Sequence, residues 1–199
     1  MEKSNHSNVL IVGGGCAGIA VASRINSLKS DLTISIVEPS EKSLYQAAWT
    51  LVGAGAYNVD DTIKPMSSVM PSYVKWIKEY AEEFLPDSNS LKTNGGTYTY
   101  DYLVVCPGLK LNYDGVAGLK ENLGKNNVCT NYSAEMATYT WDCLKQLNGG
   151  TLLFTEPPMP IKCAGAPQKI AYLAADHLKK KVALKDSNLE FLCVKIVSF

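Results

Sequence analysis

The clearest hydrophobic pattern of the chain is a short apolar run that leads directly into closely spaced glycines. Residues 9–12 read Val-Leu-Ile-Val, and such a run predicts a buried strand. Gly13, Gly15 and Gly18 follow and open a stretch of helical periodicity at 16–29. The first glycine permits a tight turn, the second lets backbone approach a pyrophosphate, and the third lets the helix pack closely on the strand. This pattern predicts a dinucleotide site; the alternative is a glycine-rich turn that binds nothing.

The acidic residue expected in such a site follows a second predicted strand. That strand spans 32–37 and ends at Glu38, whose carboxylate can accept hydrogen bonds from ribose hydroxyls. The next residues, Pro-Ser-Glu at 39–41, offer no cation for a 2′-phosphate, which disfavours NADP and leaves FAD or NAD. The helix between the two strands carries an apolar stripe at helical spacing, which comprises Ala17, Ala20, Val21, Ile25 and Leu28.

The rest of the pattern is typical of an α/β protein. Further strands are predicted at 73–77, 102–106, 151–154 and 189–194. Further helices are predicted at 133–147 and 166–181, and alternating pieces near Phe84, Leu91 and Tyr98 predict a small β-meander. Residues 44–56 mix aromatic with small residues, which indicates either a helix lining a flat ligand or ordinary core packing. We therefore expect one nearly complete dinucleotide-binding fold and the start of a second.

Composition excludes several other classes of protein. The chain has 199 residues and no net formal charge, so nothing suggests a nucleic-acid surface. No apolar run approaches the roughly 20 residues of a membrane span. The short polar N-terminus resembles neither a secretory signal nor a transit peptide. Six cysteines without scaffold spacing and two histidines argue against a disulfide-rich domain and against a metal site.

The second predicted unit departs from the first at the loop where a nicotinamide-binding unit would carry glycines. The loop after Phe154 contains prolines at 157, 158 and 160, which lack N–H donors. No pyrophosphate cradle can form from it, so NAD(P)H is not the expected reductant. Cys163 stands there instead, beside Lys162 and just before a predicted helix, and both neighbours stabilise a thiolate. The residues leave two interpretations open: a reactive thiol or a small buried cysteine.

With these residues in place, the chain resembles the sulfide:quinone oxidoreductases of animal mitochondria. The similarity runs over about residues 8–192 and is carried by 13–18, 37–41, 45–46, 49–56, 76–78 and 161–170. It implies an α/β fold of the FAD/NAD(P)-binding Rossmann-like type, with the two dinucleotide folds of glutathione reductase and the second one incomplete. An FAD-binding domain with its β-meander is expected at 1–115. The connector and the first part of the NAD-like, redox-cysteine domain are expected at 116–199.

The resemblance also implies a cofactor and a reaction. FAD is expected to be bound by Gly13, Gly15, Cys16, Ala17, Gly18, Glu38, Gln46, Ala81, Pro107 and Gly108. Cys163 matches the family's catalytic first redox cysteine, which pairs with a second cysteine downstream. Hydrogen sulfide attacks that disulfide and leaves a persulfide, whose outer sulfur passes to an acceptor such as glutathione or sulfite. Two electrons then pass through FAD to ubiquinone, in a peripheral protein of the mitochondrial inner membrane.

The chain departs from this family at its end. In family members the second redox cysteine, the quinone pocket and the membrane-binding helices lie beyond residue 199, so we expect a truncated N-terminal half that is inactive alone. Cys193 does not match the position of the family's second redox cysteine. Cys129 lies near the position of a third cysteine that bacterial members carry, and it is interpreted either as a redox residue or as a partly buried thiol of the connector. Cys106 and Cys143 are expected to be structural. The alternatives are a non-catalytic FAD-binding fragment and another flavin-dependent NADH:quinone or disulfide reductase.

Overall fold

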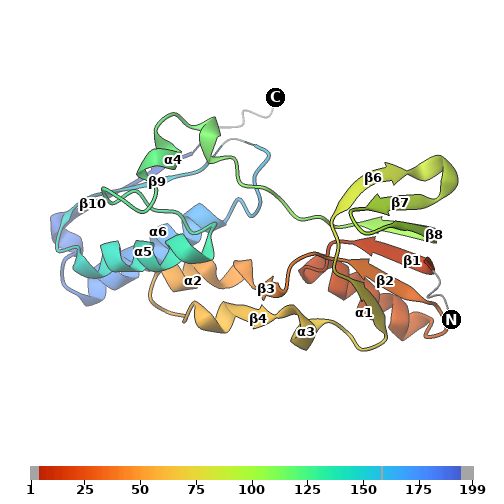
Figure 1. Ribbon diagram of the computed structural model, residues 1–199. Helices are drawn as coiled ribbons and strands as arrows, with labels where there is room; N and C mark the ends of the chain where they lie inside the picture. Colours follow the sequence, from red (N-terminus) through yellow and green to blue (C-terminus); the bar gives the residue numbers. More distant parts are fainter. Residues whose placement is uncertain (1–4, 158, 194–199) are drawn as a thin grey trace, which may run out of the picture. The chain divides into compact units, whose positions relative to one another are not determined.

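The computed structural model describes residues 5–157 and 159–193. The chain divides into two compact units (Figure 1). Unit 1 consists of Met1–Leu44 and Ile63–Leu109, and unit 2 consists of Tyr45–Thr62 and Lys110–Phe199. A short segment of unit 2, residues 45–62, therefore lies in the sequence between the two segments of unit 1.

Unit 1 is built on a six-stranded mixed sheet with the order β5-β2-β1-β8-β7-β6. The four parallel strands are β5 (Val74–Ile77), β2 (Ile34–Val37), β1 (His6–Val12) and β8 (Thr97–Val105). Strand β7 (Ser90–Thr93) pairs antiparallel with β8, and β6 (Ala81–Leu85) pairs antiparallel with β7 at the edge of the sheet. The predicted strands and the predicted meander are confirmed. However, the last piece of the meander and the strand expected at 102–106 form one strand, β8.

Both faces of β1 are covered, which explains its uninterrupted apolar run. Val9 and Ile11 belong to one buried cluster, with Ala22 of helix α1 (Cys16–Leu28). Leu10 and Val12 belong to a second cluster, with Leu91 of the meander. Strand β8 departs from the prediction of a buried strand, because Tyr102 is 68% exposed and Val105 51% exposed.

The buried face of α1 agrees only in part with the predicted stripe. Val21 and Ile25 of the stripe pack against the cluster that contains Val9 and Ile11, as predicted. Gly18 and Ala22 are buried, whereas Ala17, Ala20 and Leu28 are exposed. The reason is the close approach at Gly18, where an added Cβ would lie 1.9 Å from the carbonyl oxygen of Gly13. This contact turns the face of Gly18 and Ala22 toward the sheet.

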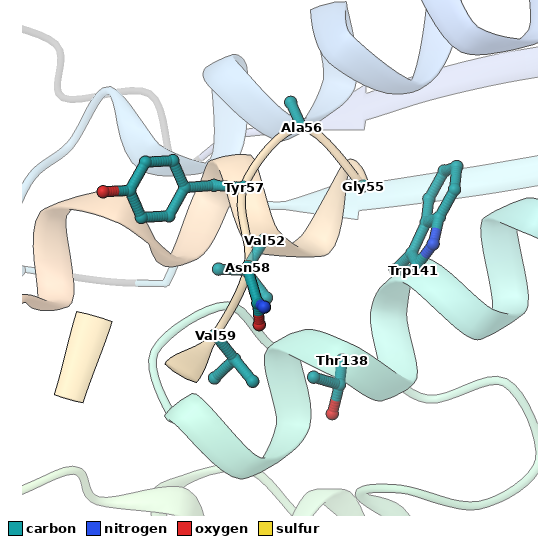
Figure 2. A pocket seen from close by; sticks show the side chains of 8 residues that line it. All are labelled: Val52, Gly55, Ala56, Tyr57, Asn58, Val59, Thr138 and Trp141. Carbon is teal, nitrogen blue, oxygen red and sulfur yellow. The ribbon is translucent and has the colours of Figure 1, made fainter. Parts of the chain in front are cut away.

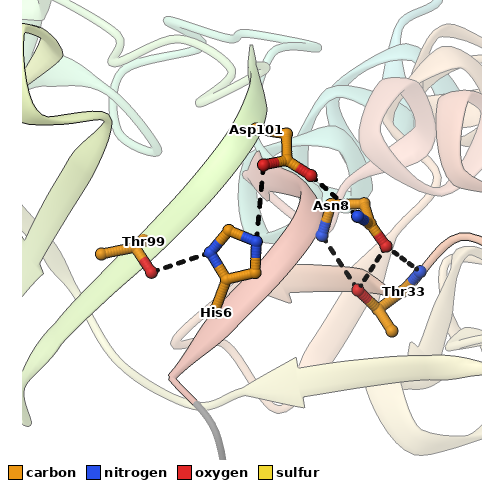
Figure 3. Close-up of polar contacts among 5 residues, drawn as sticks. All are labelled: His6, Asn8, Thr33, Thr99 and Asp101. Carbon is orange, nitrogen blue, oxygen red and sulfur yellow. Dashed lines mark hydrogen bonds and ion pairs between the residues drawn. The ribbon is translucent and has the colours of Figure 1, made fainter.

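The amino-terminal end of the sheet is held by polar side chains (Figure 3). His6 Nδ1 lies 2.9 Å from Thr99 Oγ1, and its Nε2 lies 3.5 Å from an Asp101 carboxylate oxygen. Asn8 donates to the same carboxylate at 2.7 Å and accepts from the Thr33 N–H at 3.0 Å. These contacts join β1 to β8 and to the residue before β2, at the end opposite to the glycines.

The remaining elements of unit 1 are short. Strands β3 (Lys42–Leu44) and β4 (Ile63–Pro65) pair antiparallel. Helix α3 (Met66–Val69) follows β4 and buries Met66. A 3₁₀ turn at Pro86–Ser88 joins β6 to β7.

The described residues of unit 2 contain a β-α-β arrangement and three further α-helices. Strands β9 (Gly150–Thr155) and β10 (Ser187–Leu192) are parallel and are joined by α6 (Ala166–Lys180). Helix α5 (Ala134–Gln146) precedes β9, α2 (Trp49–Gly53) follows a 3₁₀ turn at Gln46–Ala48, and α4 (Leu119–Asn122) lies in the connector. Single 3₁₀ turns are found at Asp60–Thr62, Tyr113–Gly115 and Leu184–Asp186.

Core packing accounts for the mixed aromatic and small residues before and within α2. Trp49 and Val52 form a buried cluster with Ala137 of α5. The Trp49 indole N–H donates to the Thr62 hydroxyl at 3.1 Å. Gly55 has a φ of +71°, and a Cβ there would lie 2.4 Å from the Trp141 ring. The small residues thus allow close packing of this segment against α5.

The described residues contain neither a membrane-spanning helix nor a cluster of metal-binding side chains. Among residues 5–157 and 159–193, no helix has both the length and the apolar character needed to cross a bilayer. The same residues contain no group of three or more His, Cys, Asp or Glu side chains arranged to hold a metal ion.

Candidate functional site

The glycine loop has a geometry that fits a bound pyrophosphate. Gly13 has a φ of +102°, and a Cβ there would lie 2.0 Å from the Cys106 carbonyl oxygen. An added Cβ at Gly15, in contrast, would meet no atom within 4 Å. Gly15 is the N-cap of α1, has no side-chain cap, and is followed by a first turn without acidic residues. Free space over Gly15 and the positive end of the helix dipole are therefore available to an anion.

Glu38 connects the end of β2 to this loop. One of its carboxylate oxygens accepts from the Gly14 N–H at 2.8 Å, and the other accepts from the Ser40 N–H at 2.8 Å. The approach is close, because a Cβ on Gly14 would lie 2.7 Å from the Glu38 Cβ. The carboxylate is thus fixed beside the loop by two backbone donors.

Glu38→Gln is expected to lower the stability of unit 1 by about 1–2 kcal/mol, because the new amide removes charge from bonds to two backbone donors. It is also expected to weaken FAD binding. Urea unfolding and the FAD content of the purified chain measure the two effects. The control is Glu41→Gln, whose wild-type carboxylate pairs with Lys78 at 2.9 Å on the exposed surface. Equal losses in both variants would contradict a specific role for Glu38.

Pro107, Gly108 and Ala81 occupy different positions around the same sheet. The Cys106 N–H donates to the Val12 carbonyl at 2.7 Å, so Pro107 and Gly108 directly follow the contact between β8 and the loop. Gly108 has a φ of +76°. Ala81 begins β6 and packs against the cluster that contains Leu10. The predicted site residues of unit 1 other than Ala81 thus gather where β1, β2 and β8 end.

Cys163 and Gln46 line one small pocket in unit 2. Cys163 is exposed and has a φ of +61°, a left-handed conformation that is uncommon outside glycine. Its carbonyl accepts from the Ala166 N–H at 2.9 Å, where α6 begins. Pro167 lies in the first turn of α6, as predicted. Pro158, one of the prolines of this loop, lies outside the described residues. The pocket is lined by Gln46, Ala47, Thr50, Asn131, Tyr132, Lys162, Cys163, Ala166 and Lys169.

Tyr132 holds the backbone on which Cys163 lies. Its hydroxyl donates to the Lys162 carbonyl at 3.0 Å and lies 3.4 Å from the Cys163 carbonyl oxygen. Burial raises the pKa of Tyr132, and the nearby Cys163 and Glu156 raise it further. The phenol therefore remains protonated and able to donate at neutral pH.

Tyr132→Phe is expected to cost about 1 kcal/mol of stability, the usual contribution of such hydrogen bonds. Because the pKa of Tyr132 is raised in the folded state, its contribution is fully present below the unfolded-state pKa of about 10 and is lost as pH rises through the folded-state pKa. Urea unfolding of both proteins from pH 7 to 11 measures this difference. A difference that stays constant across that range would contradict the assignment.

A larger pocket of about 400 Å³ lies elsewhere in unit 2 (Figure 2). It is lined by Val52, Gly55, Ala56, Tyr57, Asn58, Val59, Thr138 and Trp141. The Trp141 ring stands on α5 at one side of it (Figure 2), edge to face with His177 at a centroid distance of 4.9 Å. The lining contains no thiol, carboxylate or amine, whereas that of the smaller pocket contains the Cys163 thiol and two lysines.

Two residues of the site were not predicted. Gly14 lies between the glycines of the motif, and its N–H binds Glu38; the consecutive glycines at 13–15 were the available signal. Tyr132 had no local signal, because its contact with Lys162 joins residues 30 positions apart.

Residues 7–137 match the family model for pyridine nucleotide-disulphide oxidoreductases. The chain belongs to this family. The match contains the glycine loop and Glu38 and ends before β9. The family's domain binds FAD, so the predicted cofactor and the predicted α/β Rossmann-like fold are confirmed at the level of the domain.

Individual relatives of this family are similar over nearly the whole chain. The mitochondrial sulfide:quinone oxidoreductase of Mus musculus is 40% identical over 94% of the chain, and that of Dictyostelium discoideum is 43% identical over 96%. The crystal structure of the sulfide:quinone oxidoreductase of Aquifex aeolicus has a TM-score of 0.77 and 28% identity over 94% of the chain. The predicted resemblance is confirmed. The chain spans 42–43% of the length of each of these three proteins.

Proposed function

We propose that this flavin-dependent oxidoreductase domain is part of a protein that oxidises hydrogen sulfide through a persulfide on Cys163. The observation that carries the proposal is an exposed thiol in a left-handed conformation, just before α6 and in a small pocket that two lysines also line. It occurs in a chain that is about 40% identical to sulfide:quinone oxidoreductases. Because two of those relatives are mitochondrial, the proposed location is the mitochondrion, at the inner membrane.

The residues that would hold FAD are those predicted from the sequence. The backbone of Gly13, Gly15, Cys16, Ala17 and Gly18 would face the pyrophosphate, and Glu38 would accept from the ribose. Ala81, Pro107, Gly108 and Gln46 would contact the rest of the cofactor. The free space over Gly15 supports this assignment. When bound, FAD would supply a two-electron acceptor, and ubiquinone would be the final acceptor of these electrons.

Cys163 would carry the sulfur, and the pocket would position it. A hydrosulfide ion that attacks a disulfide at Cys163 leaves a persulfide there and releases the second thiol. Lys162 and Lys169 line the pocket, and their positive charges favour the approach of an anion. The persulfide would then pass its outer sulfur to a thiol such as glutathione or to sulfite.

The two alternative functions, an NADH-dependent reductase and a non-catalytic FAD-binding fragment, require different features around Cys163. An NADH-dependent reductase needs a pyrophosphate cradle between β9 and α6, and the proline content of 157–160 disfavours one. A non-catalytic FAD-binding fragment needs no reactive thiol, and Cys163 would then behave as any exposed cysteine.

The test uses the purified chain with its thiols converted to mixed disulfides with thionitrobenzoate. Hydrosulfide displaces the coloured aromatic thiolate and leaves a persulfide on the cysteine, so each released thiolate corresponds to one sulfur bound. We expect Cys163 to gain sulfur about tenfold faster than Cys16 and Cys193, which are also exposed. Persulfide-trapping alkylation and peptide mapping identify the site. Equal rates at all three cysteines would favour the non-catalytic alternative.

A further inference from the structure

Two thiols outside the Cys163 pocket converge on one asparagine of unit 2. Cys129 lies in the connector and donates to the Asn127 backbone carbonyl, with Sγ 3.5 Å from the oxygen. Cys143 lies on α5 and donates to the Asn127 side-chain oxygen at 3.7 Å. The Asn127 N–H in turn donates to the Tyr139 hydroxyl at 3.1 Å. The backbone and side chain of a single residue therefore bring the two sulfurs together.

The two thiols also interact directly. Burial, the proximity of Cys143 and the hydrogen bond with Cys143 together raise the pKa of Cys129 to about 12. Cys129 is thus a neutral thiol at physiological pH, next to a second thiol. Cys143 causes part of the increase in the pKa of Cys129. Modification of the Cys143 sulfur therefore removes that part of the increase and makes Cys129 easier to ionise.

The segment that carries Cys129 is irregular, whereas Cys143 is fixed on a helix. Asn126 and Asn127 have φ values of 51° and 61°, so this turn uses two consecutive left-handed residues. Both cysteines are partly exposed, which leaves them within reach of small molecules in solution.

We propose that Cys129 and Cys143 form a reversible dithiol–disulfide pair that reacts with low-molecular-weight disulfides. Cys143 attacks oxidised glutathione, which forms a mixed disulfide and releases one glutathione thiolate. The Cys129 thiol then loses its proton to solvent, and its thiolate attacks the Cys143 sulfur, which forms the Cys129–Cys143 disulfide and releases the second glutathione thiolate. The two protein thiols lose two electrons and two protons, and oxidised glutathione becomes two molecules of glutathione. The pair is separate from the proposed sulfide chemistry and does not require bound FAD.

The sequence permits a direct test by peptide mapping. The chain is incubated with oxidised glutathione, its remaining thiols are alkylated, and it is digested with trypsin. Cleavage after Lys125 and Lys145 releases 126–145, which contains both cysteines. We expect this peptide to be unalkylated and lighter by two hydrogen atoms. A further cleavage after Glu135 separates the cysteines, so the two pieces stay joined only through the disulfide.

Single variants distinguish the pair from general reactivity. In Cys129→Ser we expect glutathione to remain bound to Cys143, because no second thiol displaces it. Cys106→Ser, at a partly buried thiol of unit 1, is the matched control and should leave the disulfide unchanged. The oxidised wild type should also melt several degrees higher than the reduced protein, since the bond closes a loop. Stable glutathionylation of Cys143 in the wild type, or a disulfide from Cys129 to another cysteine, would overturn the proposal.

Discussion

Gly13→Ala is expected to prevent stable folding of unit 1, whereas Gly15→Ala is expected to keep the fold and lose FAD. At Gly13 a methyl group would lie 2.0 Å from a backbone oxygen and would require a φ of +102°. Strain of this kind costs about 1–3 kcal/mol before the steric clash is added, so we expect a total loss above about 3 kcal/mol. Urea unfolding of the two variants and the wild type measures it.

Gly15→Ala is the variant matched to Gly13→Ala, and it tests cofactor binding rather than folding. The φ of Gly15 is −74°, which alanine adopts freely, and a Cβ there meets no protein atom within 4 Å. The added methyl would occupy the space proposed for the pyrophosphate, so FAD affinity should fall at least about tenfold, or about 1.4 kcal/mol. Titration with FAD followed by flavin fluorescence tests this. A Gly15→Ala chain that binds FAD with wild-type affinity would exclude the loop as the FAD cradle.

Cys163→Ser is expected to abolish the fast phase of sulfur uptake in the mixed-disulfide assay. A serine hydroxyl forms no disulfide, so no persulfide can form at that position, and the rate left is that of the remaining cysteines. The loss should be at least about tenfold in the initial rate. The release of the aromatic thiolate after addition of sulfide measures it directly.

Cys193→Ser provides the comparison for this variant, because both wild-type cysteines are exposed thiols of unit 2. It should remove one slow equivalent and leave the fast phase intact. Unchanged urea unfolding of Cys163→Ser would show that the effect is chemical. If the fast phase survives in Cys163→Ser, the sulfur carrier is another cysteine and the proposed function is wrong.

The two predictions depend on different levels of inference from the sequence. The conformation of the glycine loop was predictable, since glycine spacing after a β-branched run is a local signal. The distance from Gly13 to Cys106 was not, because it depends on the pairing of β1 with a strand that lies some 90 residues later in the chain. Cys163 was recognised by its neighbours and by resemblance, but its left-handed backbone and the Tyr132 contact were not.

By itself the sequence determined the strands and helices that surround the glycine loop, the acid that follows β2, and the family resemblance. Periodicity and glycine spacing are local properties of the sequence, so they can be recognised without knowledge of how the elements pack. Only the tertiary structure decided that α1 buries Ala22 and leaves Ala17 and Ala20 exposed, and that residues 97–105 form one strand. It alone brought Cys129 and Cys143 to Asn127. Such contacts join positions far apart in the chain, and close packing of whole elements selects them.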